Sequence, residues 1–356
     1  VVVRASFNVP VKDGVVENSF RIERALPTLQ FLKDAGARVV ILAHIGRDPH
    51  ESLLPVFNVL KNKLPISFAR TKEEVKEISE TLKEGEFVLL ENTRNEPGET
   101  KNDEALSLFY ASLGEVFVND AFAASHREHA SVFGVARHLP AYAGDQLLLE
   151  VQALEDARMP EHPAFLILGG AKFETKRPLI ERSLDFYDYI FVGGALANDF
   201  FKAKGYEVGR SLISNDISGI ASLLEHPRIL LPSDVVVQGE NGNTRVCAPS
   251  GVARDEIILD AGHETLSMLL PHIQESAFIL WNGPLGNYEA GFKEQTEALA
   301  RLIAESSAVS IVGGGDTIAS ISSLSLESQF SFLSTGGGAM LEFLVKGTLP
   351  GIDILR

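Results

Sequence analysis

The sequence predicts an α/β protein with two doubly wound parallel sheets. Short apolar runs alternate with amphipathic stretches of helical period along the whole chain. Runs that are apolar at every position are typical of strands buried on both faces, as in parallel sheets covered by helices. Ten such runs within 356 residues favour two sheets over one, because a single hydrophobic core rarely grows to this size.

The elements follow in order along the chain. Strands are expected at 1–4, 38–43, 87–90, 116–119, 164–168, 189–192, 229–231, 278–281, 309–312 and 330–333. Helices are expected between them, among others at 24–34, 103–113, 179–185 and 292–305. A further polar-flanked helix at 144–159, closed by Pro160 and Pro163, is either the junction between two domains or an ordinary surface helix.

The composition is that of a globular enzyme. Hydrophobic residues make up 45% of the chain and charged residues 22%, which excludes a disordered or fibrous chain. A net charge of −16 argues against a nucleic-acid surface, which requires a basic face. No apolar segment approaches the ~20 residues of a membrane span. Cys247 is the single cysteine, which excludes an intrachain disulfide and fits a cytoplasmic protein.

Two glycine-rich turns carry the strongest chemical signal. Gly313-Gly314-Gly315-Asp316-Thr317 and Gly336-Gly337-Gly338-Ala339 each follow an apolar run and precede a helical pattern. A strand that ends in glycines and opens into a helix exposes backbone N–H groups at the positive end of the helix dipole, where phosphate binds well. Asp316 or Thr317 could hold a metal ion on that phosphate. One such turn alone could be purely structural, but two copies one strand apart favour a nucleotide or a phosphorylated substrate.

Neither turn matches the commonest phosphate-binding motifs. The dinucleotide fingerprint requires Gly or Ala where this chain has Ile318 and Leu341. The P-loop and the protein-kinase landmarks are absent from the sequence. A nicotinamide-dependent oxidoreductase is therefore disfavoured.

The first half of the chain supplies arginines in suggestive positions. Arg47, Arg94 and Arg127 each follow an expected strand, and Arg21 follows a glycine-containing turn. Ligands of open α/β sheets bind at the carboxyl ends of the strands, and guanidinium groups match phosphate and carboxylate oxygens in bidentate fashion. One such arginine is usually a surface ion pair, but three in the same topological position favour an anion pocket.

Two segments of the second half fit a nucleotide. Gly169-Gly170-Ala171-Lys172 and Lys176 follow an expected strand, and lysines at a helix start would direct their charges at one phosphate chain. The alternative is a solvated first helical turn, although lysine there opposes the helix dipole. Trp281-Asn282-Gly283-Pro284 leads to Glu289, whose carboxylate suits ribose hydroxyls; the alternative is a structural turn.

Taken together, six motifs closely resemble those of the phosphoglycerate kinase family. They occur in the order of the family and span nearly the whole chain. They are Arg4-Ala5-Ser6-Phe7-Asn8-Val9-Pro10, His44-Ile45-Gly46-Arg47, Gly169-Gly170-Ala171-Lys172, Trp281-Asn282-Gly283-Pro284, Gly314-Gly315-Asp316-Thr317 and Ser334-Thr335-Gly336-Gly337-Gly338-Ala339.

The resemblance implies two Rossmann-like lobes joined by a hinge helix. Residues 1–147, with 341–356 returning to them, would bind 3-phosphoglycerate, and residues 148–340 would bind the nucleotide. The implied reaction is the reversible glycolytic transfer of a phosphoryl group from 1,3-bisphosphoglycerate to Mg-ADP, giving 3-phosphoglycerate and ATP. Magnesium would arrive with the nucleotide, and the protein would be a cytoplasmic monomer without nucleic-acid or membrane partners.

The resemblance also assigns site residues. Catalytic positions are Arg21, Lys172, Gly314 and Gly337. Substrate positions are Ser6, Phe7, Asn8, Arg21, His44, Ile45, Gly46, Arg47, Arg94 and Arg127. Nucleotide positions are Gly170, Lys172, Lys176, Gly193, Gly194, Gly262, Asn282, Pro284, Glu289, Gly314, Gly315, Asp316 and Thr317, with Asp316 also on the metal ion.

One departure leaves an alternative open. The family usually has Asp where this chain has Ser6, and that carboxylate helps to hold the hydroxyl group of the substrate. Serine accepts fewer hydrogen bonds and cannot balance the charge of Arg21. The sequence therefore fits an active kinase or, alternatively, a homologue that binds the same ligands but turns over weakly. Arg21, Lys172, Lys176 and Asp316 are all present, which favours the enzyme.

Overall fold

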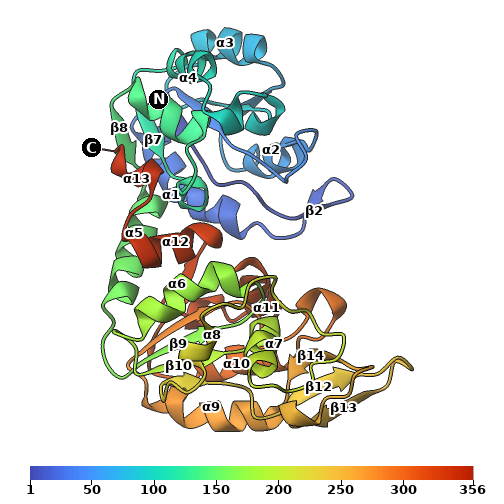
Figure 1. The fold of residues 1–356 in the computed structure, drawn as a ribbon. Helices are drawn as coiled ribbons and strands as arrows, with labels where there is room; N and C mark the ends of the chain where they lie inside the picture. Colours follow the sequence, from blue (N-terminus) through green and yellow to red (C-terminus); the bar gives the residue numbers. More distant parts are fainter. Residues whose placement is uncertain (356) are drawn as a thin grey trace. The chain divides into compact units, whose positions relative to one another are not determined.

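The structure is a computed structural model that describes residues 1–355, so position 356 of the predicted returning segment lies outside it. The chain divides into two compact units (Figure 1). Unit 1 comprises Val1–Gln152 together with the segment from Gly338 onward, and unit 2 comprises Ala153–Gly337. The chain first passes from unit 1 to unit 2 within helix α5 (Asp145–Arg158).

Unit 1 contains a six-stranded sheet in which every neighbouring pair is parallel. Its strand order is β5-β6-β4-β1-β7-β8. The strands are β1 (Val2–Arg4), β4 (Val39–Leu42), β5 (Ile66–Ala69), β6 (Phe87–Leu90), β7 (Phe117–Asn119) and β8 (Ala141–Ala143). A two-stranded hairpin, β2 (Val11–Lys12) and β3 (Val15–Val16), follows β1.

Helices cover both faces of this sheet, as its continuously buried strands require. Along β4, Val39 and Ile41 join one core cluster with α1 and α2, whereas Val40 and Leu42 join another with α3 and α4. The C-terminal helices return to this unit, where the ring of Phe343 packs against Phe122. The helices are α1 (Phe20–Asp34), α2 (Leu54–Leu60), α3 (Lys72–Thr81), α4 (Glu104–Ala111), α12 (Gly338–Lys346) and α13 (Pro350–Asp353).

Unit 2 contains a second six-stranded parallel sheet with the order β11-β10-β9-β15-β16-β17. Counted within this sheet the order is 3-2-1-4-5-6, which is that of a dinucleotide-binding fold, with the topological switch point between β9 and β15. The strands are β9 (Ala164–Leu168), β10 (Tyr189–Val192), β11 (Ile229–Leu230), β15 (Phe278–Asn282), β16 (Val309–Gly313) and β17 (Phe332–Ser334).

An antiparallel three-stranded sheet, β13-β12-β14, adds to unit 2. Phe201 of α7 packs against Val235 and Val237 of this small sheet. Its strands are β12 (Val235–Gln238), β13 (Thr244–Cys247) and β14 (Ile257–Ala261). The helices of unit 2 are α6 (Phe173–Ser183), α7 (Gly194–Ala203), α8 (Ile220–Leu223), α9 (His263–Glu275), α10 (Glu294–Ala304) and α11 (Gly315–Ser323).

The predicted fold class is confirmed: the protein is α/β with two parallel sheets. Each of the ten expected strands is present, with ends shifted by at most two residues. The sequence analysis missed the edge strands β5 and β8 and the whole antiparallel sheet. Strand β5 alternates in burial and β8 has only three residues, so neither shows the continuous apolar run of a central strand.

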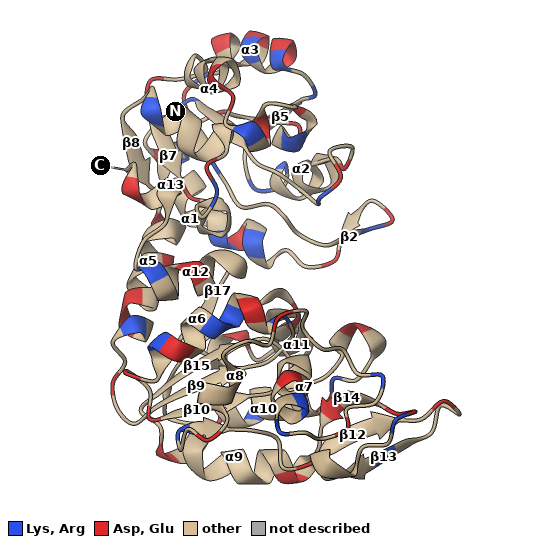
Figure 2. Ribbon diagram, viewed as in Figure 1, with Lys and Arg blue, Asp and Glu red and all other residues tan. Residues whose placement is uncertain are grey.

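Charged residues are mixed over both units. In Figure 2, Lys and Arg are interspersed with Asp and Glu in each unit. Among the residues that the structure describes, no helix has the length and apolar character needed to cross a bilayer.

Candidate active site

Parallel strands end at one edge of the sheet in unit 1, and most predicted substrate residues follow these ends. Arg21 joins them from the first turn of α1. The residues that follow strands are Ser6, Phe7 and Asn8 after β1, His44, Ile45, Gly46 and Arg47 after β4, Arg94 after β6, and Arg127 after β7.

Loops at this edge are joined by hydrogen bonds to backbone atoms. The N–H of Gly46 donates to Asn8 Oδ1 over 2.8 Å. Arg94 Nη1 donates to the Gly46 carbonyl, and Arg21 Nη1 donates to the Asn8 carbonyl. Gly46 has φ +62°, and a side-chain carbon there would lie 1.7 Å from Glu51 Oε1. The positive φ at this position favours glycine, and a larger residue would also displace the Glu51 side chain.

A buried arginine sets the protonation of His44. Arg4 is fully buried at the end of β1, and its Nη2 lies 2.8 Å from His44 Nδ1. Because a guanidinium group can only donate, Nδ1 must accept, and the ring proton resides on Nε2. Burial lowers the pKa of His44 well below its usual value, and the charges of Arg4 and Arg94 lower it further. His44 is therefore a neutral imidazole with Nε2–H as its donor.

The sequence analysis gave Arg4 no role in the site. The available signal was a single charge within an otherwise apolar strand. Burial lowers the pKa of Arg4 to about 10, and the charge of Glu99 acts in the opposite direction. Glu99 itself accepts hydrogen bonds from the backbone N–H and the hydroxyl of Ser131, whose Oγ also accepts from Arg4 Nε. This buried network holds Arg4 against His44.

Positive charge accumulates at this edge. Burial lowers the pKa of Arg94, and the neighbouring charge of Arg127 lowers it further. The charges of Arg127 and Arg21 also lower the pKa of His44. These effects of Arg127 on Arg94 and on His44 mean that the charged groups lie close to one another. An anion bound among them would relieve the repulsion between the arginines.

The remaining predicted residues of unit 1 differ in exposure. Phe7 and Ile45 are buried in the hydrophobic core, so they could meet a ligand only through their backbone. Ser6 is 5% exposed. Arg47 is exposed, and its backbone N–H donates to Glu51.

In unit 2 the glycine-rich segments meet at the switch point of the sheet. The N–H of Gly169 donates to the Asn282 carbonyl over 2.9 Å, and that of Gly170 donates to the Pro284 carbonyl over 2.8 Å. A side-chain carbon at Gly169 would lie 2.2 Å from the Pro284 oxygen. These two strand ends therefore approach each other so closely that only glycine fits.

Three helices begin at this edge, and two of them have no side-chain cap. Helices α6, α7 and α11 start just after β9, β10 and β16. The Phe173 N–H at the start of α6 donates to Ser214 Oγ over 2.8 Å, whereas α7 and α11 have no side-chain cap among the described residues. Gly193 precedes α7, and Gly314, whose φ is +104°, precedes α11. Free N–H groups at helix starts attract anions. Thr317 does not point its hydroxyl at solvent but accepts from Gly283 N–H over 3.1 Å.

The two predicted lysines have different environments. Lys172 precedes α6 in the left-handed region at φ +69° and is exposed. Lys176 is 6% exposed, and its Nζ donates to the Gly169 carbonyl. Burial lowers the pKa of Lys176 to about 8. Lys176 is thus a buried cation at the glycine turn, and a nearby negative charge would stabilise its charged form.

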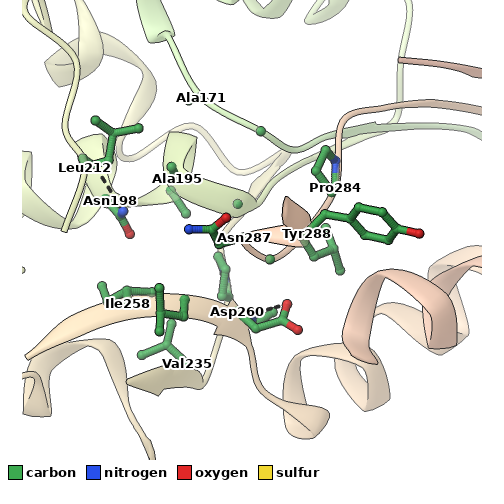
Figure 3. Close-up of a pocket in the computed structure, with 18 of the residues that line it drawn as sticks. Ala171, Ala195, Asn198, Leu212, Val235, Ile258, Asp260, Pro284, Asn287 and Tyr288 are labelled. Carbon is green, nitrogen blue, oxygen red and sulfur yellow. Dashed lines mark hydrogen bonds between the residues drawn. The ribbon is translucent and has the colours of Figure 1, made fainter. Parts of the chain in front are cut away.

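A cavity of about 300 Å³ lies beside these helix starts (Figure 3). Of the predicted nucleotide residues, those in its lining are Gly170, Gly194, Pro284, Glu289 and Asp316. Those outside its lining are Lys172, Lys176, Gly193, Gly262, Asn282, Gly314, Gly315 and Thr317. Gly262 instead lies against the Asp234 carboxylate. A side-chain carbon at position 262 would be 2.0 Å from one of its oxygens.

The opposite end of the cavity was missed by the sequence analysis. It is formed by α7, β12, β14 and the loop around Leu212, and Figure 3 shows Asn198, Leu212, Val235 and Ile258 there. The antiparallel sheet that supplies part of this wall was not predicted, so its contribution could not be. The available signal was the short apolar run Val235-Val236-Val237 of β12.

Asp316 is the predicted metal ligand. It lies in the first turn of α11 and lines the cavity, whose walls partly shield its carboxyl group from solvent. Burial raises the pKa of its carboxyl, and the negative charge of Glu289 raises it further. The described residues contain no group of three or more His, Cys, Asp or Glu side chains that could hold a metal ion by themselves.

Comparisons with known proteins agree on one family. The model of the family described as phosphoglycerate kinase matches residues 1–347. A protein named phosphoglycerate kinase from Thermus thermophilus is 45% identical, over 100% of this chain and 96% of the relative. One of the same name from Francisella tularensis subsp. novicida is 43% identical, over 100% and 95%.

Solved structures give the same result. The phosphoglycerate kinase of Coxiella burnetii is 39% identical with a TM-score of 0.81, covering 100% of this chain and 95% of that one. The enzyme of Pyrococcus horikoshii is 30% identical with a TM-score of 0.87, covering 99% and 95%. Because the family model matches residues 1–347 of this chain and full-length relatives are more than 40% identical to it, the chain belongs to the phosphoglycerate kinase family.

Proposed function

We propose a division of labour within the reaction of this family, with 3-phosphoglycerate bound by unit 1 and the nucleotide by unit 2. The chain is a phosphotransferase with a carboxyl group as acceptor, and its activity is the glycolytic phosphoryl transfer between 1,3-bisphosphoglycerate and ADP. The comparisons give no support to the alternative of a weakened binding homologue.

The cations of unit 1 support the substrate assignment. Arg94 and Arg127 supply guanidinium groups for the phosphate, while Arg21 and the Nε2–H of His44 donate to the carboxylate end. The observation that carries this assignment is the arrangement of arginines around the strand ends: Arg4 Nη2 lies 2.8 Å from His44 Nδ1, Arg94 donates to Gly46 and Arg21 donates to Asn8. A site with so much positive charge binds a ligand with several negative charges.

The nucleotide assignment rests on the open helix starts and the cavity. The base and ribose occupy the cavity, with Glu289 as acceptor for ribose hydroxyls. The phosphates extend to the N–H groups of Gly314, Gly315 and Thr317, and to Lys176. Uncapped N–H groups provide this binding without a charged side chain.

Asp316 would hold a magnesium ion carried by the nucleotide. The ion would supply charge neutralisation between the β- and γ-phosphates. Its fit rests on the pKa of Asp316, which is raised by burial and by Glu289 and would fall with a cation beside it.

Transfer needs positioning and charge stabilisation, without a covalent protein intermediate. In the direction of ATP synthesis, a β-phosphate oxygen of ADP attacks the phosphorus of the acyl phosphate. The new P–O bond forms as the bond to the carboxyl oxygen breaks, and the electron pair stays on the carboxylate. Arg21 and Lys172 stabilise the charge on the transferring group, and the N–H groups at Gly314 and Gly337 help to orient it.

We also propose that the protein is a cytoplasmic monomer. Its free cysteine, Cys247, suits a reducing compartment, and a net charge of −16 disfavours self-association. Light scattering across a range of concentrations tests the monomer: a mass above that of one chain would contradict it.

The test is a coupled assay with 3-phosphoglycerate, Mg-ATP and a dehydrogenase that consumes the bisphosphoglycerate product. We expect robust turnover from the unaltered chain. The variant Ser6→Asp should lower KM for 3-phosphoglycerate or raise kcat, by roughly five- to thirtyfold in kcat/KM, because it restores a hydrogen-bond acceptor worth ~1–2 kcal/mol in a polar pocket.

Three outcomes separate the parts of the proposal. Equal kinetics of both proteins would show that Ser6 does not weaken the site. Turnover by Ser6→Asp alone would place a defect in this one position. Silence from both folded proteins, with nucleotide still bound, would overturn the catalytic assignment.

A further inference from the structure

Asn198 is a polar residue at the apolar end of the cavity in unit 2. It lies on α7 and lines the cavity together with Phe201, Leu212, Val235 and Ile258. Figure 3 shows its amide group beside Leu212, across from Ile258 and Val235. Asn198 is only 1% exposed. A primary amide in such a setting is expected to have its hydrogen-bonding groups satisfied.

Only one end of this amide has a partner. Asn198 Nδ2 donates to the Leu212 carbonyl over 3.0 Å. Asn198 Oδ1 is buried and has no hydrogen-bond partner among the residues that the structure describes. The contact with Leu212 fixes the orientation, because a flipped amide would set two acceptor oxygens against each other. The unpaired group at the cavity wall is therefore an acceptor.

An unpaired buried acceptor is unfavourable by ~1–3 kcal/mol. A ligand that brings a donor to this point removes the penalty, whereas a ligand that brings an acceptor adds repulsion. The neighbouring side chains are apolar and offer no competing donor. The chemistry of this point thus distinguishes ligands by the group that they present.

We propose that Asn198 selects the purine base by accepting a hydrogen bond from an exocyclic amino group at position 6. This inference rests on the proposed function, since it requires the nucleotide base to occupy the apolar end of this cavity. Adenine carries an amino donor at that position. Hypoxanthine and guanine carry an oxo acceptor there, which would face Asn198 Oδ1.

The test compares three nucleoside diphosphates that differ at position 6. ADP carries the amino group, IDP carries an oxo group, and purine riboside diphosphate carries hydrogen. Their Mg-dependent affinities are measured by calorimetry on the full chain and on Asn198→Leu. We expect the unaltered chain to bind ADP roughly fivefold more tightly than purine riboside diphosphate, the equivalent of one neutral hydrogen bond, and to bind IDP more weakly still.

In Asn198→Leu these differences in affinity should vanish. The protein substitution and the change at position 6 of the base then form the equivalent of a double-mutant cycle, which isolates the interaction between them. The matched control is Asn287→Leu, in the same cavity. Asn287 Oδ1 already accepts from the Ala290 N–H, so this variant should leave the ratio of ADP to IDP affinity unchanged. Unaltered affinity for 3-phosphoglycerate verifies that each variant is folded.

The outcomes separate this inference from the proposed function. Equal binding of the three nucleotides by the unaltered chain, or an unchanged preference in Asn198→Leu, overturns the role of Asn198 while leaving the nucleotide site intact. Loss of the preference in Asn287→Leu as well overturns the assignment to Asn198 specifically. No binding of any nucleotide would instead refute the placement of the nucleotide in unit 2, and this inference with it.

Discussion

Units 1 and 2 share a parallel α/β sheet but present positive potential in different ways. Unit 1 gathers side-chain cations: the charge of Arg127 lowers the pKa of Arg94, which burial also lowers, and both arginines lower the pKa of the buried His44. Unit 2 leaves the starts of α7 and α11 without side-chain caps among the described residues, and adds one buried lysine. The first strategy places charge through side chains, and the second places partial charge through the backbone.

The difference determines which substitutions would weaken ligand binding at each site. A site made of side chains loses a contact when a single residue changes, and the proposed comparison of Ser6 with Ser6→Asp tests one such contact. A site made of backbone N–H groups depends on conformation, so it is insensitive to most side-chain changes but sensitive to the loss of a glycine with positive φ. Substitutions of each kind test this contrast.

The largest effect is expected in unit 1. Arg21→Met should lower kcat/KM by roughly a hundred- to a thousandfold, the usual loss when one donor to a developing charge is removed. The coupled assay measures it. Arg24→Met is the matched control on the same helix, where Arg24 stacks over Phe20, and it should retain nearly full activity. Comparable losses in both variants would mean that the helix, not the site, is affected.

A smaller effect is expected from the backbone of unit 2. Gly314→Ala forces a side chain into φ +104° at the start of α11. We expect ADP affinity to fall roughly thirtyfold, corresponding to ~2 kcal/mol for hydrogen bonds to a charged phosphate. Calorimetry measures the affinity.

Gly205→Ala is the control for strain alone. Gly205 has φ +82°, and a side-chain carbon there would meet no atom within 4 Å. Both variants should lose stability, by ~1 kcal/mol or more, but only Gly314→Ala should lose affinity for ADP. Equal affinities in the two variants would contradict the role of this turn in binding phosphate.

The smallest effect is a pH dependence from Lys176. Burial lowers its pKa to about 8, and contact with phosphate would raise that pKa. Lys176 is charged in both free and bound protein below pH 8, but above it the free protein must take up a proton to bind. ADP affinity should therefore fall as pH rises, by roughly tenfold between pH 7 and 9.

Calorimetry in buffers of different ionisation enthalpy measures this proton uptake directly. Lys176→Met should bind ADP more weakly at pH 7 and show no such decline between pH 7 and 9. A decline that persists unchanged in Lys176→Met would assign the titration to another group.

Much of the site's location could be predicted from the sequence because glycines and arginines follow strand ends. Parallel strands bring their carboxyl ends to one edge, so Arg94 and Arg127 could be placed together without coordinates. The buried partners could not be predicted in this way. Nothing in the local pattern indicates that Arg4 meets His44, forty residues away, since that contact depends on the pairing of β1 with β4.

The same limit applies to the nucleotide cavity. Gly170, Pro284 and Asp316 belong to motifs with their own local signatures, whereas Asn198 and Ile258 belong to none. Their approach results from α7 packing near a small antiparallel sheet, and that contact depends on the tertiary structure.

The sequence by itself determined the α/β class, the central strands and the glycine and arginine positions at their ends, because hydrophobic periodicity and glycine content act locally along the chain. The tertiary structure alone decided which tautomer His44 adopts, that Lys176 is buried, and that Asn198 leaves one acceptor unpaired. Those properties depend on what surrounds a group in space, since burial and neighbouring charges set both protonation and hydrogen bonding.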